Sequence, residues 1–561
     1  MEDYWFYLLL FFIGTIIVVY NMIQAERTRK KKFLQQLEEQ WGKFSKREYN
    51  SEEYECISHY FWEQEGNENN VIDDITWNDL DMDRMFRAMN QTQSSLGAEQ
   101  LYYMLRTPVT DTRVLKEREV VFVYMKKHKE QRVKMQTMFS FIGRTRNYSI
   151  TDYIFLLKEA KPKGVREHYL ATFLGIVSLG SLFLEPVIGI FFVIVIFGLN
   201  SFSYCKEKAN IEPSLISFAY LLRMMNVAEL LQKEELGDLK YYQKELKEIN
   251  QRFAGFRKKA GIVMSSKNSG SMLDTILDYV RMFLHIDLIQ FNKMLTVYQK
   301  EVDSCQRMIE IIGFLDAAIA VASFREALPY YSIPSLEEGM GKQMEARKLY
   351  HPLIENAVDN DISATKGVLI TGSNASGKST FLKTVAMNAI LSQTINTSVS
   401  EEYQAPCYRI YSSMSLRDNL AEHESYYMVE IKSLRRILQA VKTKNTPLLS
   451  FVDEVLRGTN TVERIAASSQ ILKELNQKHV LSFAATHDIE LTCLLEKEYD
   501  NFHFIEEIQE GDILFSYKLF EGRAKSRNAI KLLELMGYEK EIVENAEKCA
   551  NLFLETGQWK M

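Results

Sequence analysis

The hydrophobic pattern near the N-terminus predicts a membrane-spanning helix. Residues 4–22 carry no charged side chain over 19 positions, close to the ~20 apolar residues that span a bilayer. Basic side chains follow at Arg27 and at residues 29–32, whereas a cleaved signal peptide carries its basic residues first. The pattern therefore predicts an uncleaved anchor over residues 1–32, with the basic flank in the cytoplasm. A buried core helix is the alternative interpretation.

A second apolar region predicts a membrane hairpin over residues 169–204. Residues 169–184 and 186–204 are apolar, with Glu185 and Pro186 at the turn between them. The basic residues on the two flanks are Lys161, Lys163, Arg166, Lys206 and Lys208. Because basic flanks stay in the cytoplasm, the pattern predicts three transmembrane spans in a multi-pass cell-membrane protein whose other domains are cytoplasmic. A hydrophobic core hairpin within a soluble domain is the alternative.

The rest of the N-terminal half shows the three- and four-residue periodicity of helices. It covers residues 50–160 and 205–335, and the run 272–327 is long, apolar and nearly free of Gly and Pro. Small residues at 313–322 allow close packing between helices. The polar segment 257–271, which ends in Gly and Ser, predicts a loop. These helices alone indicate no function.

Composition indicates a foldable, mainly helical chain of three to four domains. The 561 residues are 46% hydrophobic and 25% charged, with only 9 prolines. The net charge of −6 excludes a global basic surface for nucleic acid. Six scattered cysteines without a CxxC pair predict reduced thiols, with no disulfide framework or zinc site. They are Cys56, Cys205, Cys305, Cys407, Cys493 and Cys549.

A nucleotide-binding loop is predicted in the C-terminal half. A β-rich run at 368–370 precedes the loop TGSNASGKST (371–380), and a helical stretch at 381–391 follows it. This strand, GxxxxGKS loop and helix form the context in which backbone N–H groups bind phosphates. Lys378 is expected to reach the terminal phosphates, and the Ser379 hydroxyl to bind Mg²⁺. The predicted ATP-binding residues are Gly372, Ser373, Asn374, Ala375, Ser376, Gly377, Lys378, Ser379 and Thr380.

Acidic residues follow a second predicted strand about 75 residues after the loop. The apolar run 447–452 ends in Asp453 and Glu454. Asp453 is expected to hold Mg²⁺ through water, and Glu454 to polarise the water that attacks the γ-phosphate. A third strand at 480–484 leads to His487, which is placed to sense the γ-phosphate. An ordinary acidic turn and an ordinary loop histidine are the alternatives.

Together these motifs resemble the MutS family of ABC-class ATPases. The loop is similar to the family's TGPNxGGKST, in which Asn374 matches a family-specific position. Residues 425–430 (SYYMVE) resemble STFMxE, residues 453–460 (DEVLRGTN) resemble DExGRGTS, and residues 485–488 (ATHD) resemble ATHY. His351-Pro352 and Asn360-Asp361 look like a stretch that lies near the adenine in that family.

The resemblance implies a fold, an activity and partners. It implies an all-α core over 50–335, an ABC-type α/β ATPase domain over 336–514 and a helical dimerisation element over 515–561. It implies hydrolysis of ATP with Mg²⁺ by a homodimer, in which Ser425 of one subunit contacts the γ-phosphate held by the other. Catalytic roles carry over to Asn374, Lys378, Glu454 and His487. Association with DNA is also implied, since the family acts in mismatch repair.

The departures from the family concern the mismatch reader. Residues 1–71 leave too little chain for the family's mismatch-reading and connector domains, and they include the predicted anchor. The expectation is a membrane-anchored, DNA-binding MutS-like ATPase without direct mismatch reading. Two alternatives remain: an ATP-gated membrane scaffold and a transporter-like ABC protein. The transporter signature LSGGQ is missing, and SYYMVE stands in its place.

Overall fold

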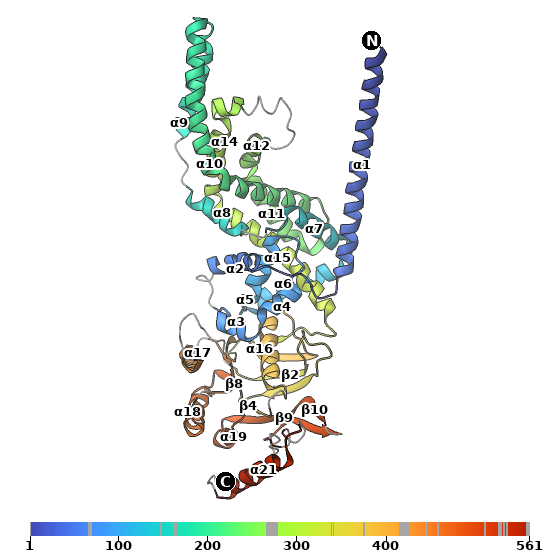
Figure 1. Cartoon of the computed structure of the whole chain (residues 1–561), viewed down its shortest axis with the longest axis vertical. Coiled ribbons are helices and arrows are strands. Elements are labelled where there is room, and N and C mark those ends of the chain that lie inside the picture. The colour runs from blue at the N-terminus through green and yellow to red at the C-terminus, as the bar shows by residue number, and fades with distance from the viewer. Residues whose placement is uncertain are drawn as a thin grey trace. The chain divides into compact units, whose positions relative to one another are not determined.

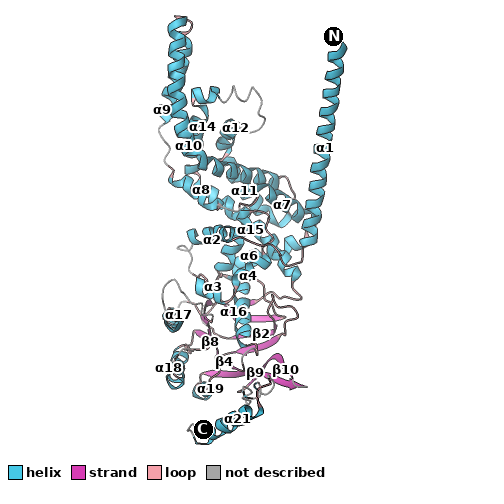
Figure 2. Cartoon of the chain, in the orientation of Figure 1, coloured by secondary structure: helices cyan, strands magenta, loops and turns pink. Residues whose placement is uncertain are grey.

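The chain folds into two compact units, a helical unit and an α/β unit. The computed structural model describes the chain apart from residues 1, 65–69, 146–148, 161–164, 265–278, 338, 340, 374–375, 415–425, 444–445, 457–458, 510–511, 525–529, 531–532, 534–536 and 557–561. The helical unit comprises residues 1–66, 88–103 and 120–327, and the α/β unit comprises 67–87, 104–119 and 328–561. Figures 1 and 2 show helices in the first unit and both strands and helices in the second. The domain boundaries expected from the sequence stay a prediction.

The helical unit is built from long helices. They are α1 (Glu2–Gln40), α2 (Ser51–Gln64), α7 (Lys129–Ile142), α8 (Ile150–Glu159), α9 (Val165–Ser181), α10 (Pro186–Gln232), α11 (Lys240–Arg252), α12 (Ala254–Met264), α14 (Ile286–Lys300) and α15 (Val302–Ala327). Three further helices pass between the units: α4 (Met82–Met89), α5 (Ser95–Arg106) and α6 (Thr112–Lys127). Aromatic rings form the centre of the packing, where Phe218 contacts Phe256 and Phe291 with ring centroids 5.1 and 5.2 Å apart.

A buried carboxylate joins α15 to the start of α5. Asp316 accepts hydrogen bonds from the backbone N–H groups of Gln93 (3.0 Å) and Ser94 (2.8 Å) and from the Ser94 hydroxyl (2.7 Å). The two helices meet closely, because a Cβ on Gly97 would lie 2.3 Å from an Asp316 oxygen and one on Gly313 would lie 2.9 Å from a backbone oxygen. Small residues of α15 therefore permit close helix packing, as the sequence pattern predicts.

The α/β unit contains two sheets. The six-stranded sheet has the order β10-β9-β4-β8-β7-β6, parallel except for β10, which pairs antiparallel with β9. Its strands are β4 (Gly367–Thr371), β6 (Arg409–Ser413), β7 (Leu448–Asp453), β8 (Val480–Ala485), β9 (Tyr499–Gln509) and β10 (Asp512–Glu521). The smaller sheet, of order β1-β5-β2-β3, comprises β1 (Ser335–Glu337), β2 (Met344–Leu349), β3 (Asn360–Ala364) and β5 (Glu402–Pro406).

Helices surround the six-stranded sheet and bury its central strands. They are α16 (Lys378–Ile395), α17 (Tyr426–Val441), α18 (Thr461–Glu474) and α19 (Ile489–Leu494), and α21 (Lys540–Thr556) follows the sheet. Strands β4, β7 and β8 are buried at every position, as expected for parallel strands covered on both faces. The short helix α3 (Asp74–Asp79) packs on the edge strand β6, where the Ser412 hydroxyl donates to Asp79 at 2.7 Å.

Several boundaries differ from those predicted. The basic segment 257–271 was expected to be a loop, but its first part is helical in α12, which packs against α14. The run 272–327 is divided after α14 at Glu301, and His285 breaks the helix before it with a φ of +50°. The predicted helical element at 515–561 begins later, because residues up to Glu521 continue the sheet as β10.

The apolar helices match the predicted spans only in part. Within the described residues, two helical stretches are long and apolar enough to cross a membrane, Pro186–Ile211 and Ser214–Gln232. The first contains the predicted span 186–204, whereas the second is half buried, continues α10 and was not predicted as a span. Residues 169–184 fall largely in α9, which has only 17 residues. The prediction of three spans is therefore not supported as stated.

Apolar side chains are exposed in both segments that were predicted to lie in the membrane, α1 and the α9–α10 hairpin. Phe183, Leu184 and Val187 at the turn between α9 and α10 are 82–91% exposed. In α1, Phe12, Val18 and Met22 are 57–66% exposed. Pro186 occupies the first turn of α10, where the missing N–H group has no helical partner to lose.

The close contact between α5 and α15 generates a stability prediction. Replacing Gly97→Ala places a methyl group on the buried Asp316 carboxylate, so the free energy of unfolding should fall by about 1–3 kcal/mol. Gly255→Ala is the matched control, because a Cβ there meets open space, and it should change stability by less than about 0.5 kcal/mol. Urea denaturation of the detergent-solubilised chain measures both. Equal stability of the two variants would contradict the close packing.

Candidate nucleotide-binding site

The register of three parallel strands brings their C-terminal ends to one edge of the sheet. Ile370 of β4 pairs with Ala485 of β8, and Ala485 pairs with Asp453 of β7. The pairing continues past the strands, because the N–H of Thr486 donates to Ile370 O (3.0 Å) and that of Glu454 to Ala485 O (2.9 Å). The glycine loop, the acidic pair and the His487 segment therefore leave the sheet side by side, as the sequence predicts.

The glycine loop wraps the start of α16. Gly372 and Gly377 have φ angles of +151° and +108°, values that side chains with a Cβ rarely adopt. The buried Lys378 ammonium donates to the backbone oxygens of Gly372 (2.9 Å) and Ser373 (2.7 Å). Ser379 and Thr380 are exposed at the first turn of the helix, whereas Ser376 is buried. Asn374 and Ala375 lie outside the described residues.

Glu454 and His487 form a pair beside Lys378. His487 Nε2 lies 2.9 Å from a Glu454 carboxylate oxygen and 3.4 Å from Lys378 Nζ. The Lys378 ammonium can only donate a hydrogen bond, and the Glu454 carboxylate can only accept one. Nε2 would have to lack a proton to accept from Lys378 and carry one to donate to Glu454, so it cannot form both hydrogen bonds at once. The shorter distance assigns the proton of Nε2 to the hydrogen bond with Glu454. Glu454 also has a φ of +56°, an unusual conformation for a residue with a side chain.

Oxygen ligands suited to Mg²⁺ stand on the loop and on β7. Asp453 is the last residue of the strand and is buried, and the Ser379 hydroxyl is exposed at the start of α16. Mg²⁺ prefers hard oxygen ligands and keeps several waters, so one carboxylate, one hydroxyl and substrate phosphates fit it. Among the described residues, no group of three or more His, Cys, Asp or Glu side chains forms a separate metal site.

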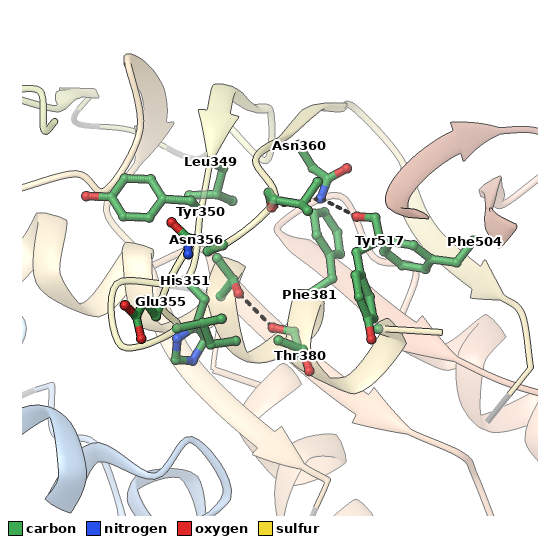
Figure 3. Close-up of a pocket in the computed structure, with 15 residues that line it drawn as sticks. Leu349, Tyr350, His351, Glu355, Asn356, Asn360, Thr380, Phe381, Phe504 and Tyr517 are labelled. Carbon is green, nitrogen blue, oxygen red and sulfur yellow. Dashed lines mark hydrogen bonds between the residues drawn. The ribbon is translucent and has the colours of Figure 1, made fainter. Parts of the chain in front are cut away.

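A cavity of about 430 Å³ adjoins the glycine loop. Figure 3 shows its wall, which combines the segment 349–360 with Phe504 and Tyr517 and with Thr380 and Phe381 of α16. The Phe381 and Phe504 rings meet edge to face, with centroids 6.0 Å apart. This volume lies within the ~300–1,000 Å³ range of small-molecule sites, which are mostly apolar with a few polar groups.

His351 and Asn360 both line this cavity, and their expected proximity to adenine stays a prediction. Burial, then the charges of Arg84 and Lys383, lower the pKa of His351 to about 4. The ring is therefore neutral near pH 7, and its Nδ1 accepts from the N–H of Leu353 at 3.2 Å. Asn360 donates to Tyr517 O at 3.0 Å and accepts from Leu519 N at 2.8 Å, which ties β3 to β10.

Three contacts of the site were not predicted from the sequence. The Ser373 hydroxyl donates to Glu506 of β9. Arg464 of α18 binds Asp488 with two hydrogen bonds of 2.7 and 2.9 Å, which holds the segment that carries His487. The buried Glu430 of α17 accepts from the N–H of Leu456, just after the acidic pair. Glu430 closes the SYYMVE motif, so that motif was the available signal; Ser425, its first residue, lies outside the described residues.

The parallel sheet, the glycine loop and the buried helix α16 define a P-loop domain. Comparison with known proteins makes this more specific, because residues 368–554 match the family model "MutS domain V". The DNA mismatch repair protein MutS of Thermus thermophilus is 31% identical over 255 residues, which are 44% of this chain and 30% of that protein. The corresponding MutS of Halalkalibacterium halodurans is 29% identical over 256 residues, 43% of this chain and 29% of that protein.

The match to the MutS family model lies within the C-terminal α/β unit, so this unit is similar to the corresponding part of MutS proteins. MutS of Listeria welshimeri is 27% identical over 288 residues, 49% of this chain and 33% of that protein. The match spans about a third of the length of these relatives.

Proposed function

We propose that this chain is a membrane-anchored, MutS-like ATPase that associates with DNA as a homodimer and does not read mismatches directly. The observation that carries the ATPase is the convergence of Lys378, Glu454 and His487 at the edge of the sheet, beside a cavity of nucleoside size. Figure 3 places Thr380 and Phe381 of the loop helix in that cavity. ATP would lie with its adenosine in the cavity and its phosphates on the loop.

Each side chain has a role in the proposed hydrolysis. Lys378 exchanges its contacts with the loop carbonyls for the terminal phosphates. Glu454 accepts a proton from the attacking water, and His487, hydrogen-bonded to Glu454, orients the carboxylate and faces the γ-phosphate. Ser379 and Asp453 would hold Mg²⁺, which would supply positive charge to the phosphates when bound. In the proposed dimer, Ser425 of the second subunit completes the site.

Substitutions should separate binding of ATP from its hydrolysis. Lys378→Ala should abolish tight ATP binding, because the phosphates lose their cation. Glu454→Gln should bind ATP with near-normal affinity and hydrolyse it at least about 100-fold more slowly, the scale of a lost general base. Filter binding and phosphate release measure the two steps. Glu490→Gln is the matched control, because it makes the same substitution at an exposed residue of α19. It should hydrolyse ATP normally.

Wild-type turnover by Glu454→Gln would sink the assignment of the base. The same assay tests the dimer, since mixing Lys378→Ala with Ser425→Arg chains leaves one intact composite site. A mixture as inactive as its parents would contradict the shared site.

DNA association is proposed on the similarity of the α/β unit to MutS proteins, and the proposal includes no side chain that inserts between bases. Candidate phosphate contacts are Lys258 and Lys259 on α12, whereas Arg257 is already paired with Glu229 at 2.5 Å. Without a side chain inserted into the base stack, a mispair offers no advantage. Affinity should then come from phosphate contacts and fall steeply with salt.

Binding should be equal for a perfect duplex and a G·T duplex, with a steep salt slope. Fluorescence anisotropy with perfect, G·T and branched duplexes at several salt concentrations measures this. Lys258→Gln with Lys259→Gln should lower both affinity and slope, whereas Lys240→Gln with Lys244→Gln on α11 should not. A tenfold preference for G·T, about 1.4 kcal/mol, would imply a mismatch reader. No binding at low salt would favour an ATP-gated membrane scaffold.

Membrane attachment is proposed through α1 and the α9–α10 hairpin. Water-exposed side chains such as Phe183 and Leu184 are costly, and they match the apolar surface that a bilayer covers. The basic flanks after α1 and around the hairpin place the N-terminus and the Glu185–Pro186 turn outside, with the ATPase in the cytoplasm.

Cysteine labelling on intact cells tests this topology. In a background without the exposed Cys205 and Cys493, Asp3→Cys and Glu185→Cys should react with an impermeant maleimide. Glu490→Cys on α19 should react only after permeabilisation. Labelling of Glu490→Cys on intact cells would overturn the orientation, and recovery of the chain in the soluble fraction would overturn the attachment.

A further inference from the structure

A second cavity, of about 660 Å³, lies within the helical unit and is separate from the nucleotide site. Its wall comes from the last turns of α1, the segment 43–47, the connection between α4 and α5, and Arg144 after α7. The residues that line it are Gln36, Glu39, Gln40, Lys43, Phe44, Ser45, Lys46, Arg47, Asn90, Gln91, Gln93 and Arg144. Four of these side chains are cationic, and only Glu39 is a carboxylate.

Most of this positive charge has no ion-pair partner. Arg47 pairs with Glu53 and stacks over the Tyr49 ring, 4.7 Å from its centroid. Lys43, Lys46 and Arg144, by contrast, form no salt bridge within the described part of the chain. The carboxylate of Glu39 already accepts a hydrogen bond from Gln35 at 2.9 Å.

Two carboxylates that favour the charged form of Arg144, Asp316 and Glu53, already have other partners. Asp316 accepts hydrogen bonds from the N–H groups of Gln93 and Ser94, and Glu53 pairs with Arg47. Desolvation by the surrounding protein and, second, the positive charge of Arg47 lower the pKa of Arg144 to about 10. Arg144 therefore remains charged at neutral pH, beside other cations that it repels.

Long-range hydrogen bonds hold the wall in place. The Gln91 amide donates to the backbone oxygens of Gln40 (3.1 Å) and Lys43, and its carbonyl accepts from the Ser323 hydroxyl at 2.8 Å. The N–H of Gly42 donates to the same hydroxyl at 3.1 Å. The two contacts with Ser323 connect residues more than 200 positions apart, so the cavity belongs to the fold and not to a loop alone.

We propose that this cavity binds a small soluble ligand that carries two or more phosphate groups. Three cations without a salt bridge in the described residues match several phosphate charges. The buried amide nitrogen of Asn90, which has no hydrogen-bond partner among those residues, adds a donor of the kind that fixes a ligand's orientation. Its volume is that of a small-molecule site, whereas a nucleic-acid surface is an extended basic stripe.

The position of the cavity also favours a soluble ligand over a lipid headgroup. From residue 22 to residue 40, helix α1 rises about 27 Å at ~1.5 Å per residue. If residues 4–22 lie in the membrane, the cavity is far below the headgroups. A ligand there would bridge the end of α1 to the α4–α5 connection and so couple the anchor helix to the helical unit.

Calorimetric titration with inorganic tripolyphosphate tests the site in the full chain. The chain carries Lys378→Ala, so that the glycine loop does not contribute and the result is independent of ATP hydrolysis. One equivalent should bind. Adding Lys43→Gln, Lys46→Gln and Arg144→Gln should weaken affinity at least tenfold, whereas the matched three-charge control Lys240→Gln, Lys244→Gln and Lys247→Gln should retain it.

Several outcomes would overturn the proposal. The first is no binding of tripolyphosphate to the Lys378→Ala chain, and the second is an equal loss of affinity in the control variant. The third is displacement of tripolyphosphate by a short DNA duplex that binds the same residues. Lys46→Gln alone, at an exposed side chain, guards against misfolding of the triple variant. It should weaken affinity about threefold with an unchanged melting temperature in the absence of ligand, and unchanged affinity would count against the site.

Discussion

The register of the parallel strands β4, β8 and β7 is the constraint on which the candidate site depends. Ile370, Ala485 and Asp453 lie in one row of the sheet. A shift of one residue in any pair would turn every side chain of that strand to the opposite face. Because all three strands are buried at every position, such a shift would also have to repack both sides of the sheet. Packing against the helices thus fixes where Lys378, Glu454 and His487 meet.

The elements of the α/β unit could be predicted from the sequence because local signals agreed there. Three signals follow one another directly in the chain: the β-rich run at 368–370, the glycine loop and the helical stretch after Lys378. Each has a composition typical of the element that it forms. The same holds for the apolar strands before Asp453 and His487. Segments without such local signals were harder to predict. Residues 257–264 contain three basic residues and were predicted to form a loop, yet they belong to helix α12, which packs against α14.

Contacts between distant residues could not be predicted. Ser373 and Glu506 are separated by 133 positions, and Arg464 and Asp488 by 24. No local pattern pairs them, since a surface carboxylate and a loop hydroxyl are common everywhere. The cavity of the helical unit is of the same kind, because Lys43, Asn90 and Arg144 come from three separate segments. Their shared chemistry appears only once Asp316 and Gln91 have brought those segments together.

If ATP binds at the glycine loop as proposed, its binding exchanges one set of interactions for another. Lys378 already donates to two backbone oxygens, and Ser373 already donates to Glu506. The free energy of phosphate binding is therefore the difference between the new hydrogen bonds to phosphate and the existing ones within the protein. The net contribution of each hydrogen bond is modest for this reason. Glu506 adds a second consequence, because its negative charge lies next to a site for anions. Repulsion from Glu506 would oppose weakly held phosphates and would be overcome only when Lys378, the loop N–H groups and Mg²⁺ act together, which favours a triphosphate with its metal over a lone phosphate.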